Sequence, residues 1–101
     1  MLRQETISEA ETRLVVSGPL YGEAAEEFAG KMEALCKSNY RTITLDLSIA
    51  VGITSATLGK LVSVQKRLLV ENRAVRINGC SEVLYGIFAK IKLDTLIQIT
   101  R

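Results

Sequence analysis

A cluster of hydroxyl side chains is the feature of this sequence with the clearest chemical potential. Thr54, Ser55 and Thr57 follow an apolar stretch and stand where a segment with helical spacing begins. A Ser or Thr at a helix start can cap the helix by accepting a hydrogen bond from a backbone N–H group. It can also accept a phosphate, because the helix start tolerates negative charge. Both interpretations of the cluster are open at this point.

Enzymatic chemistry is restricted by composition. The 101 residues include no histidine, which excludes a Ser-His-Asp triad, a Cys-His pair and a histidine metal site. Cys36 and Cys80 form no CxxC motif, so we expect buried free thiols in a reducing compartment and no structural zinc. Lys60 is the only nearby candidate base for Ser55. We therefore expect no enzymatic activity, no metal and no cofactor.

Asp46 and two glycines are the other residues that could mark a site. Receiver domains phosphorylate an Asp near a strand end, but they also need an acidic pair after the first strand, which residues 14–17 do not provide. We therefore expect Asp46 to be a strand-end or turn residue. Gly52 and Gly59 are expected where the backbone needs freedom or packs closely, since neither lies in a phosphate-binding glycine motif.

Length and charge limit the partners. Hydrophobic residues make up 48% and charged residues 24% of the chain, which predicts one globular domain over residues 1–101. A net charge of +2, without a basic stripe and interleaved aromatics, argues against nucleic acid. No run reaches the roughly 18 apolar residues of a spanning helix, and no signal sequence begins the chain. We expect a cytoplasmic protein that does not insert into membranes.

Hydrophobic periodicity predicts the elements that would position the hydroxyl cluster. Alternation and β-branched residues predict strands, including a hairpin around the polar turn at residues 8–11. Gly18-Pro19 is expected to break the chain after that hairpin, and residues 48–54 are expected to form a loop before the second helix. Apolar residues at helical spacing predict three helices, the last with Ser81 as a plausible N-cap. The expected strands are residues 2–7, 12–17, 41–47, 74–78 and 96–100, and the expected helices are residues 22–37, 55–71 and 81–91.

The order ββαβαβαβ predicts the fold class. A helix between each pair of later strands implies parallel strands with right-handed crossovers. We therefore expect a single α/β domain with a mixed, mostly parallel sheet, an N-terminal antiparallel hairpin and three helices.

Several short motifs together resemble a known family. A strand ending in Asp46-Leu47-Ser48 leads through the hydroxyl cluster to Leu58-Gly59-Lys60-Leu61. Three further segments match the same family in order and spacing: a turn at residues 17–20, a strand with its turn at residues 75–81, and the approach to the last strand at residues 92–96. The chain resembles, over nearly its whole length, the STAS domain family of bacterial anti-sigma factor antagonists.

This resemblance implies a regulatory protein-binding role. In that family the unphosphorylated domain binds a serine kinase that doubles as an anti-sigma factor. Phosphorylation at the start of the second helix releases the domain from the kinase, and a protein phosphatase restores the unphosphorylated form. Aligned on Leu58-Gly59, Ser55 matches the phospho-acceptor, with Thr57 and then Thr54 as alternates. The resemblance implies partner binding by Thr54, Ser55, Thr57 and Lys60, and it leaves the oligomeric state open.

Three residues depart from the family pattern. Thr54 replaces an acidic residue, Thr57 replaces a glycine, and Tyr21 stands where many antagonists carry Asp. These departures keep a second interpretation open. The chain could be a constitutive STAS subunit of a larger assembly, such as a lipid-transport ABC complex or a stressosome-like particle, without a phospho-switch.

Overall fold

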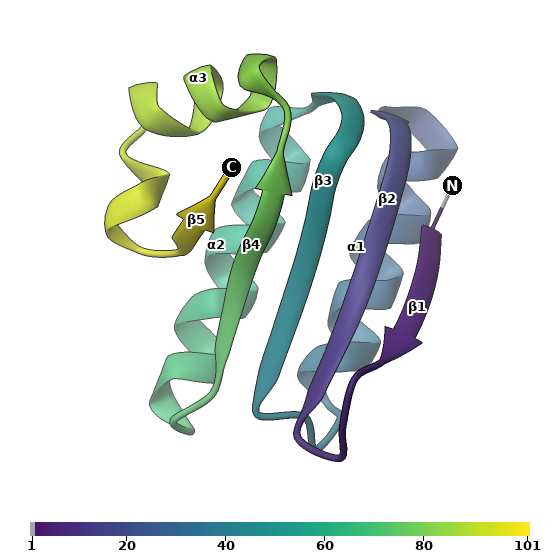
Figure 1. Ribbon diagram of the computed structural model, residues 1–101, viewed down its shortest axis with the longest axis vertical. Coiled ribbons are helices and arrows are strands. Elements are labelled where there is room, and N and C mark those ends of the chain that lie inside the picture. Colours follow the sequence, from purple (N-terminus) through teal and green to yellow (C-terminus); the bar gives the residue numbers. More distant parts are fainter. Residues whose placement is uncertain (1) are drawn as a thin grey trace.

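A five-stranded sheet forms the centre of the protein (Figure 1). The computed structural model describes residues 2–101. β1 (Leu2–Thr6) pairs antiparallel with β2 (Glu11–Leu20), and β3 (Thr42–Ile53), β4 (Ala74–Cys80) and β5 (Gln98–Thr100) follow in parallel. The strand order is β1-β2-β3-β4-β5, so each strand is hydrogen-bonded to the strand that follows it in the sequence.

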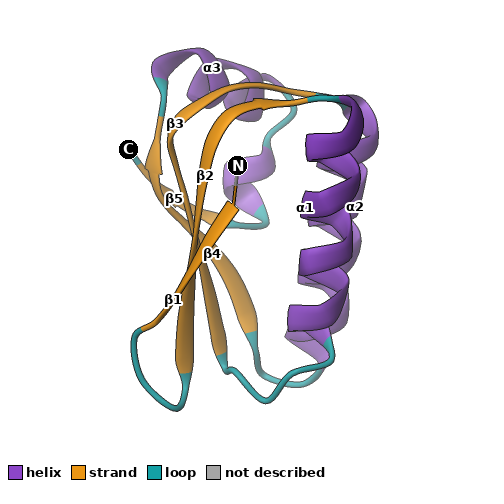
Figure 2. Cartoon of the chain, turned by 90° about the vertical axis from the view of Figure 1, so that its right-hand side faces the viewer, coloured by secondary structure: helices purple, strands orange, loops and turns teal. Residues whose placement is uncertain are grey.

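Helices cover the sheet unevenly. α1 (Gly22–Cys36) and α2 (Ser55–Val70) stand together on one side of the sheet (Figure 2). α3 (Glu82–Lys90) lies across the end of the sheet where β3 and β4 finish, and the short 3-10 helix η1 (Leu93–Thr95) leads into β5 (Figure 1). No helix in the described part of the chain is long and apolar enough to cross a bilayer.

The core lies between the sheet and the α1–α2 layer. Alternate residues of β2 and β3 point into it, because successive side chains of a strand face opposite sides. The helices contribute the apolar stripes that the periodicity predicts. The largest fully buried side chains include Leu14, Leu20, Phe28, Met32, Ile43, Leu45, Leu47, Leu61, Leu68, Ile77, Leu84 and Phe88.

The fold class and the element order are confirmed, but two expected chain breaks are wrong. β2 does not end at Gly18-Pro19, and residues 48–53 are strand, not loop. The two strands continue side by side, with Ser17 opposite Ile49 and Leu20 opposite Ile53. Register shifts interrupt the ladder, and Gly18 adopts a φ of 82° next to one of them. A glycine accepts this conformation without strain, so the strand bends and continues.

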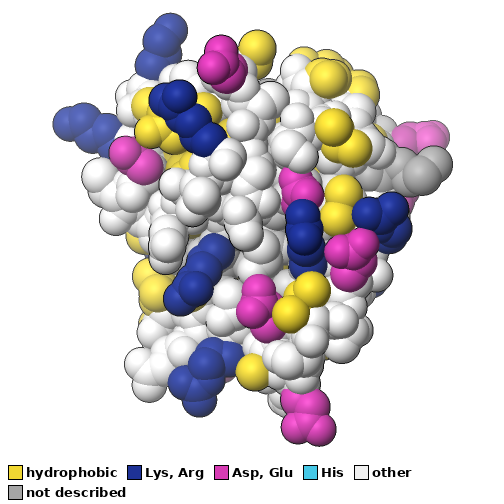
Figure 3. Space-filling view, in the orientation of Figure 1, with side chains coloured by type: hydrophobic (Ala, Val, Ile, Leu, Met, Phe, Trp, Pro, Cys, Tyr) yellow, Lys and Arg dark blue, Asp and Glu magenta, His cyan; other side chains and the backbone are white. Residues whose placement is uncertain are grey.

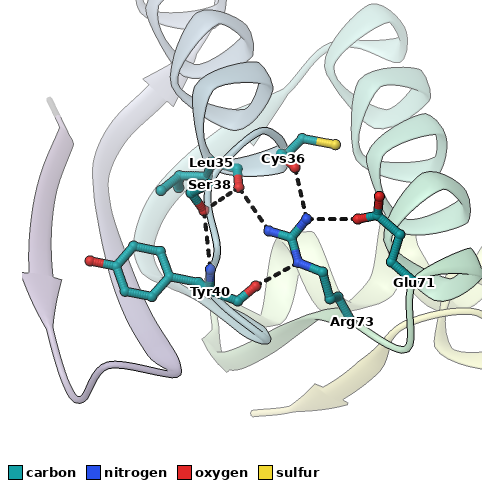
Figure 4. Close-up of polar contacts among 6 residues, drawn as sticks. All are labelled: Leu35, Cys36, Ser38, Tyr40, Glu71 and Arg73. Carbon is teal, nitrogen blue, oxygen red and sulfur yellow. Dashed lines mark hydrogen bonds and ion pairs between the residues drawn. The ribbon is translucent and has the colours of Figure 1, made fainter.

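The end of the molecule where α1 finishes is fastened by one side chain, Arg73 (Figure 4). Its guanidinium donates to the carbonyl oxygens of Leu35, Cys36 and Tyr40 at 3.2, 2.9 and 2.7 Å, and to Glu71 Oε1 at 2.9 Å. The side chain is 12% exposed. Carbonyls at a helix end have no partner within the helix. Arg73 satisfies them and ties α1 to the segment that enters β4; we call this arrangement the Arg73 clamp.

Candidate functional site

Within the hydroxyl cluster, the two threonines take part in the helix cap and the serine does not. Thr54 is the N-cap of α2, in an extended conformation, and its Oγ1 accepts a hydrogen bond from the Thr57 N–H at 3.2 Å. The hydroxyl of Thr57 lies 3.0 Å from that of Thr54, and Thr57 is only 3% exposed. Capping and burial thus account for both threonines.

Ser55 is in a different environment. It is the first residue of α2 and is exposed. No group within residues 2–101 hydrogen-bonds to its hydroxyl. Because Thr54 supplies the cap, capping does not explain the hydroxyl at Ser55. The phospho-acceptor role of Ser55 stays a prediction, and the geometry leaves this hydroxyl accessible, unlike that of Thr57.

Lys60 takes part in an ion network between the two helices. Its Nζ lies 2.7 Å from Glu33 Oε1, and Arg67 contacts both oxygens of the same carboxylate at 2.7 and 3.1 Å. Hydrogen bonds from Arg67 and Lys60 lower the pKa of Glu33 to about 2. Lys60 is therefore held against α1 by Glu33. It carries no contact to Ser55 that would suit a catalytic base.

Exposed apolar side chains lie at the same end of the molecule. Ile49 and Val51 on the last part of β3 are 58% and 62% exposed, and Tyr21 before α1 is 52% exposed. Figure 3 shows apolar side chains gathered where β2 and β3 end. Contiguous exposed apolar side chains on a protein surface often mark a site of interaction with a partner. We call Tyr21, Ile49, Val51, Thr54 and Ser55 together the α2-start surface.

Gly52 explains how Tyr21 is placed on this surface. A Cβ at Gly52 would stand 2.0 Å from the Tyr21 hydroxyl oxygen and 2.7 Å from its Cζ. The ring therefore lies against the bare backbone of β3. The expected close packing is confirmed for Gly52, whereas a Cβ at Gly59 would meet nothing within 4 Å.

A groove beside Ser55 completes the surface. It has a volume of about 160 Å³ and runs between the first turns of α1 and α2. Most of its lining side chains are short, so they do not fill the space between the two helices. The lining residues are Ala25, Glu26, Ala29, Thr54, Ala56 and Thr57. The arrangement places a shallow groove next to an exposed hydroxyl, and a partner could contact both.

Asp46 has a structural role that differs from the expectation. It lies inside β3, where the ladders to β2 and β4 shift register, and not at a strand end. Its carboxylate accepts hydrogen bonds from the Ser48 N–H and hydroxyl and from Arg13, at 3.0, 2.6 and 2.5 Å. Burial opposes ionisation, but these hydrogen bonds outweigh it and hold the pKa of Asp46 below its ordinary value. The carboxylate thus fixes the irregular part of the strand.

The described residues include no cluster of metal ligands, and burial makes one of the two thiols unreactive. Residues 2–101 contain no group of three or more His, Cys, Asp or Glu side chains placed to hold a metal ion. Both cysteines are free, as expected, but only Cys80 is buried, and Cys36 is half-buried. Burial raises the pKa of the Cys80 thiol, which disfavours the reactive thiolate.

Sequence comparison identifies the family. Residues 4–98 match the family described as "Mlab, STAS domain". The chain belongs to the STAS domain family. No curated protein matches its sequence.

Solved structures share the fold of this STAS domain. The anti-sigma factor antagonist SpoIIAA in its unphosphorylated form is 15% identical, with a TM-score of 0.82 over 100% of this chain and 89% of that one. The phosphorylated form of SpoIIAA, a Bacillus cell fate determinant, is 14% identical, with a TM-score of 0.78 over 100% and 92%. A structure of Mglu is 18% identical over 79% of this chain and 20% of its own, with a TM-score of 0.64. At these identities the likeness shows the fold.

Sequence reasoning missed part of the surface of this STAS domain. The sequence pattern indicates a loop at residues 48–54, whereas the structure has exposed Ile49 and Val51 on a strand. In the sequence, Tyr21 stands out only as a departure from the family pattern. The alternation of exposed Ile49 and Val51 with buried Ala50 and Gly52 is the signal that could have revealed the strand.

Proposed function

We propose that this STAS domain is a non-enzymatic regulator that binds a protein partner through the α2-start surface, and that phosphorylation of Ser55 weakens the binding. The observation that carries the proposal is the exposed Ser55 hydroxyl on the first residue of α2, next to a helix cap supplied by Thr54. The fold shared with SpoIIAA, an anti-sigma factor antagonist with an unphosphorylated and a phosphorylated form, supports this role.

A phosphate at Ser55 would change the surface without unfolding the domain. It adds a charge of about −1.5 to −2 at neutral pH. The helix start carries a partial positive charge and α2 has no acidic residue in its first turn, so the domain tolerates the added charge. A partner seated on Ile49, Val51 and the groove would meet this charge in a partly dehydrated interface. Repulsion or desolvation then weakens the complex.

The partner that fits this switch is a kinase-type anti-sigma factor, with a protein phosphatase as the second partner. A kinase must reach the Ser55 hydroxyl, and it would do so while seated on the neighbouring apolar side chains. The proposal places the protein in the cytoplasm, where ATP for the kinase is available.

The direct test is incubation with the cognate kinase and ATP, followed by mapping of phosphate by mass spectrometry. We expect the phosphate on Ser55. Ser55→Asp should weaken partner binding by about tenfold or more, as measured by calorimetry. Ser63→Asp is the matched control, because Ser63 is an exposed serine further along the same helix. Phosphate found only outside residues 54–57, or equal affinities for Ser55→Asp and the wild type, would contradict the switch.

A second function is favoured by one observation: Ile49 and Val51 expose apolar surface on β3, and neither side chain carries a group that a phospho-switch would modify. The domain would then be a constitutive subunit of a larger assembly, such as a lipid-transport ABC complex or a stressosome-like particle. In that case Val51→Asp should abolish assembly while Ser55→Asp changes affinity by less than about twofold. Loss of binding in both variants, together with phosphate on Ser55, favours the regulated switch.

A further inference from the structure

β1 is an edge strand with one side free. It pairs with β2 on its inner side and has no neighbouring strand on the outer side within residues 2–101. The Ile7 N–H donates to the Glu11 carbonyl. Because hydrogen-bonded positions alternate in an antiparallel pair, Arg3 and Glu5 direct their backbone groups to β2, whereas Leu2, Gln4 and Thr6 direct theirs outward. The outer edge is therefore ready to pair with another strand.

The charges of β1 are arranged symmetrically about Gln4. Arg3 and Glu5 flank it and project from the sheet face opposite α1 and α2, and they contact each other at 3.0 Å with side chains 71% and 38% exposed. Figure 3 shows basic and acidic side chains together over β1. Gln4 faces the other side, where its Nε2 donates to the Thr12 hydroxyl. One end of this short strand is thus positive and the other negative.

We propose that β1 pairs antiparallel with β1 of a second copy of this chain, with Gln4 on the two-fold axis. The two sheets then continue as one. Gln4 exchanges backbone hydrogen bonds with the partner's Gln4, and Leu2 does so with the partner's Thr6. Arg3 stands opposite the partner's Glu5 at a non-hydrogen-bonded position, where cross-strand side chains approach most closely.

Charge selects this register. A shift that keeps the outward backbone groups paired moves the strand by two residues. One such shift sets Arg3 opposite the partner's Arg3, and the other sets Glu5 opposite the partner's Glu5. Like charges directly opposite each other are destabilising. Only the register centred on Gln4 joins opposite charges at every such position.

The face of α1 next to β1 has the same self-complementarity. A groove of about 330 Å³ lies between them, with Leu2, Leu14, Gly30 and Ala34 among its lining residues and Glu27 and Lys31 beside it. The two-fold axis makes α1 antiparallel to the partner's α1 and joins the two grooves. Glu27 and Lys31 are one helical turn apart, so this edge of α1 carries an acidic and a basic side chain in sequence, as β1 does.

The same charges make the contact selective. Charged residues and short length are the usual protection of an edge strand. Arg3 and Glu5 disfavour a strand that places like charges opposite them, and they match a second copy. A contact made by a five-residue strand and one helix face lies at the weak end of specific interfaces, so we expect a dissociation constant in the micromolar range or weaker.

The test is sedimentation equilibrium of the intact chain over a range of concentrations. The wild type should form dimers that dissociate on dilution. Arg3→Glu and Glu5→Arg should each raise the dissociation constant about tenfold, because each places like charges at both cross-strand positions. An equimolar mixture of the two single variants should regain the wild-type constant as a heterodimer. The double variant Arg3→Glu/Glu5→Arg should regain it as a homodimer.

Two control variants distinguish pairing through β1 from self-association through another face of the molecule. Lys66→Glu changes an exposed charge on α2, and Ser55→Asp changes the α2-start surface; neither should alter the dimer, so the outcome is independent of the proposed function. Circular dichroism verifies that each variant is folded. A wild type that stays monomeric at all concentrations, or a mixture that dimerises no better than its components, would overturn the proposal.

Discussion

The two ends of the α1–α2 layer use their polar groups in opposite ways. At one end, the Arg73 clamp satisfies three backbone carbonyls and pairs with Glu71. At the other end, Ser55 has an unpaired, exposed hydroxyl, and Ile49 and Val51 present apolar surface to water. The clamped end uses its polar groups in folding, and our proposal assigns the exposed groups of the α2-start surface to an external partner.

This difference separates stability from recognition along the same pair of helices. The clamp holds α1 relative to β4, and the Glu33 network holds α1 against α2. These contacts hold α1 and α2 together, so the proposed docking groove at the start of the helices would need little reordering on binding. Changes at the clamped end should reduce stability and spare binding, and changes at the α2-start surface should do the reverse.

The largest effect is expected for Arg73→Ala. Removal of the guanidinium leaves the carbonyl oxygens of Cys36 and Tyr40 without their charged donor, whereas Leu35 keeps its hydrogen bonds from Ser38. We expect the free energy of unfolding to fall by about 2–4 kcal/mol, as measured by urea denaturation. Affinity for a partner of the α2-start surface should stay within about twofold at temperatures where the variant is folded.

Arg73→Lys is the matched variant for this prediction. It keeps the charge but loses the planar fork that reaches several carbonyls at once. It should recover only part of the lost stability. An Arg73→Ala variant as stable as the wild type would show that the clamp does not fasten this end and would remove the contrast between the two ends.

An intermediate effect on stability is expected for replacement of Glu33, which links α1 to α2 between the two ends of the helix layer. Its pKa in the folded protein is about 2, against an ordinary value of 4.5. The ionised carboxylate therefore stabilises the fold at pH values above the ordinary pKa, and this contribution is lost as the pH falls from about 4.5 toward 2. Compared with Glu33→Gln, the wild type should melt at a higher temperature near neutral pH, and the gap should close across that acidic range.

Glu26→Gln provides the control for the pH series. Glu26 is an exposed carboxylate on the same helix that forms no ion pair within residues 2–101. Its replacement should change the melting temperature little at any pH. A gap for Glu33→Gln that stays constant down to pH 2 would mean that the ion network adds nothing to the fold.

Periodicity predicted most of this fold because each helix and strand buries a regular apolar pattern. Phe28, Met32 and Leu61 lie at helical spacing, and Ile43, Leu45 and Leu47 alternate as in a strand. The prediction failed at Gly18-Pro19 and at residues 48–53, where paired strands continue past a change of register. Glycine and proline usually mark a break, and pairing with a distant strand overrides that local signal.

The site could be predicted only in part. The position of Ser55 followed from helix spacing and from family resemblance. The division of roles within the cluster did not, because Thr54 and Ser55 are both good caps by residue type. The Arg73 clamp joins residues that are 33 to 38 positions apart in sequence. No local pattern encodes a contact of that range.

The smallest and most discriminating effect is expected within the hydroxyl cluster itself. Thr54→Ala removes the acceptor of the Thr57 N–H and should lower the free energy of unfolding by about 1 kcal/mol. Ser55→Ala removes a hydroxyl that contacts no group in the described residues, so the change should stay within about 0.5 kcal/mol. Urea denaturation of the two variants side by side measures both values. Equal losses would mean that Ser55 also supports the helix start. Its accessibility would then no longer separate a recognition role from a structural one, and the contrast between the two ends would be confined to Ile49 and Val51.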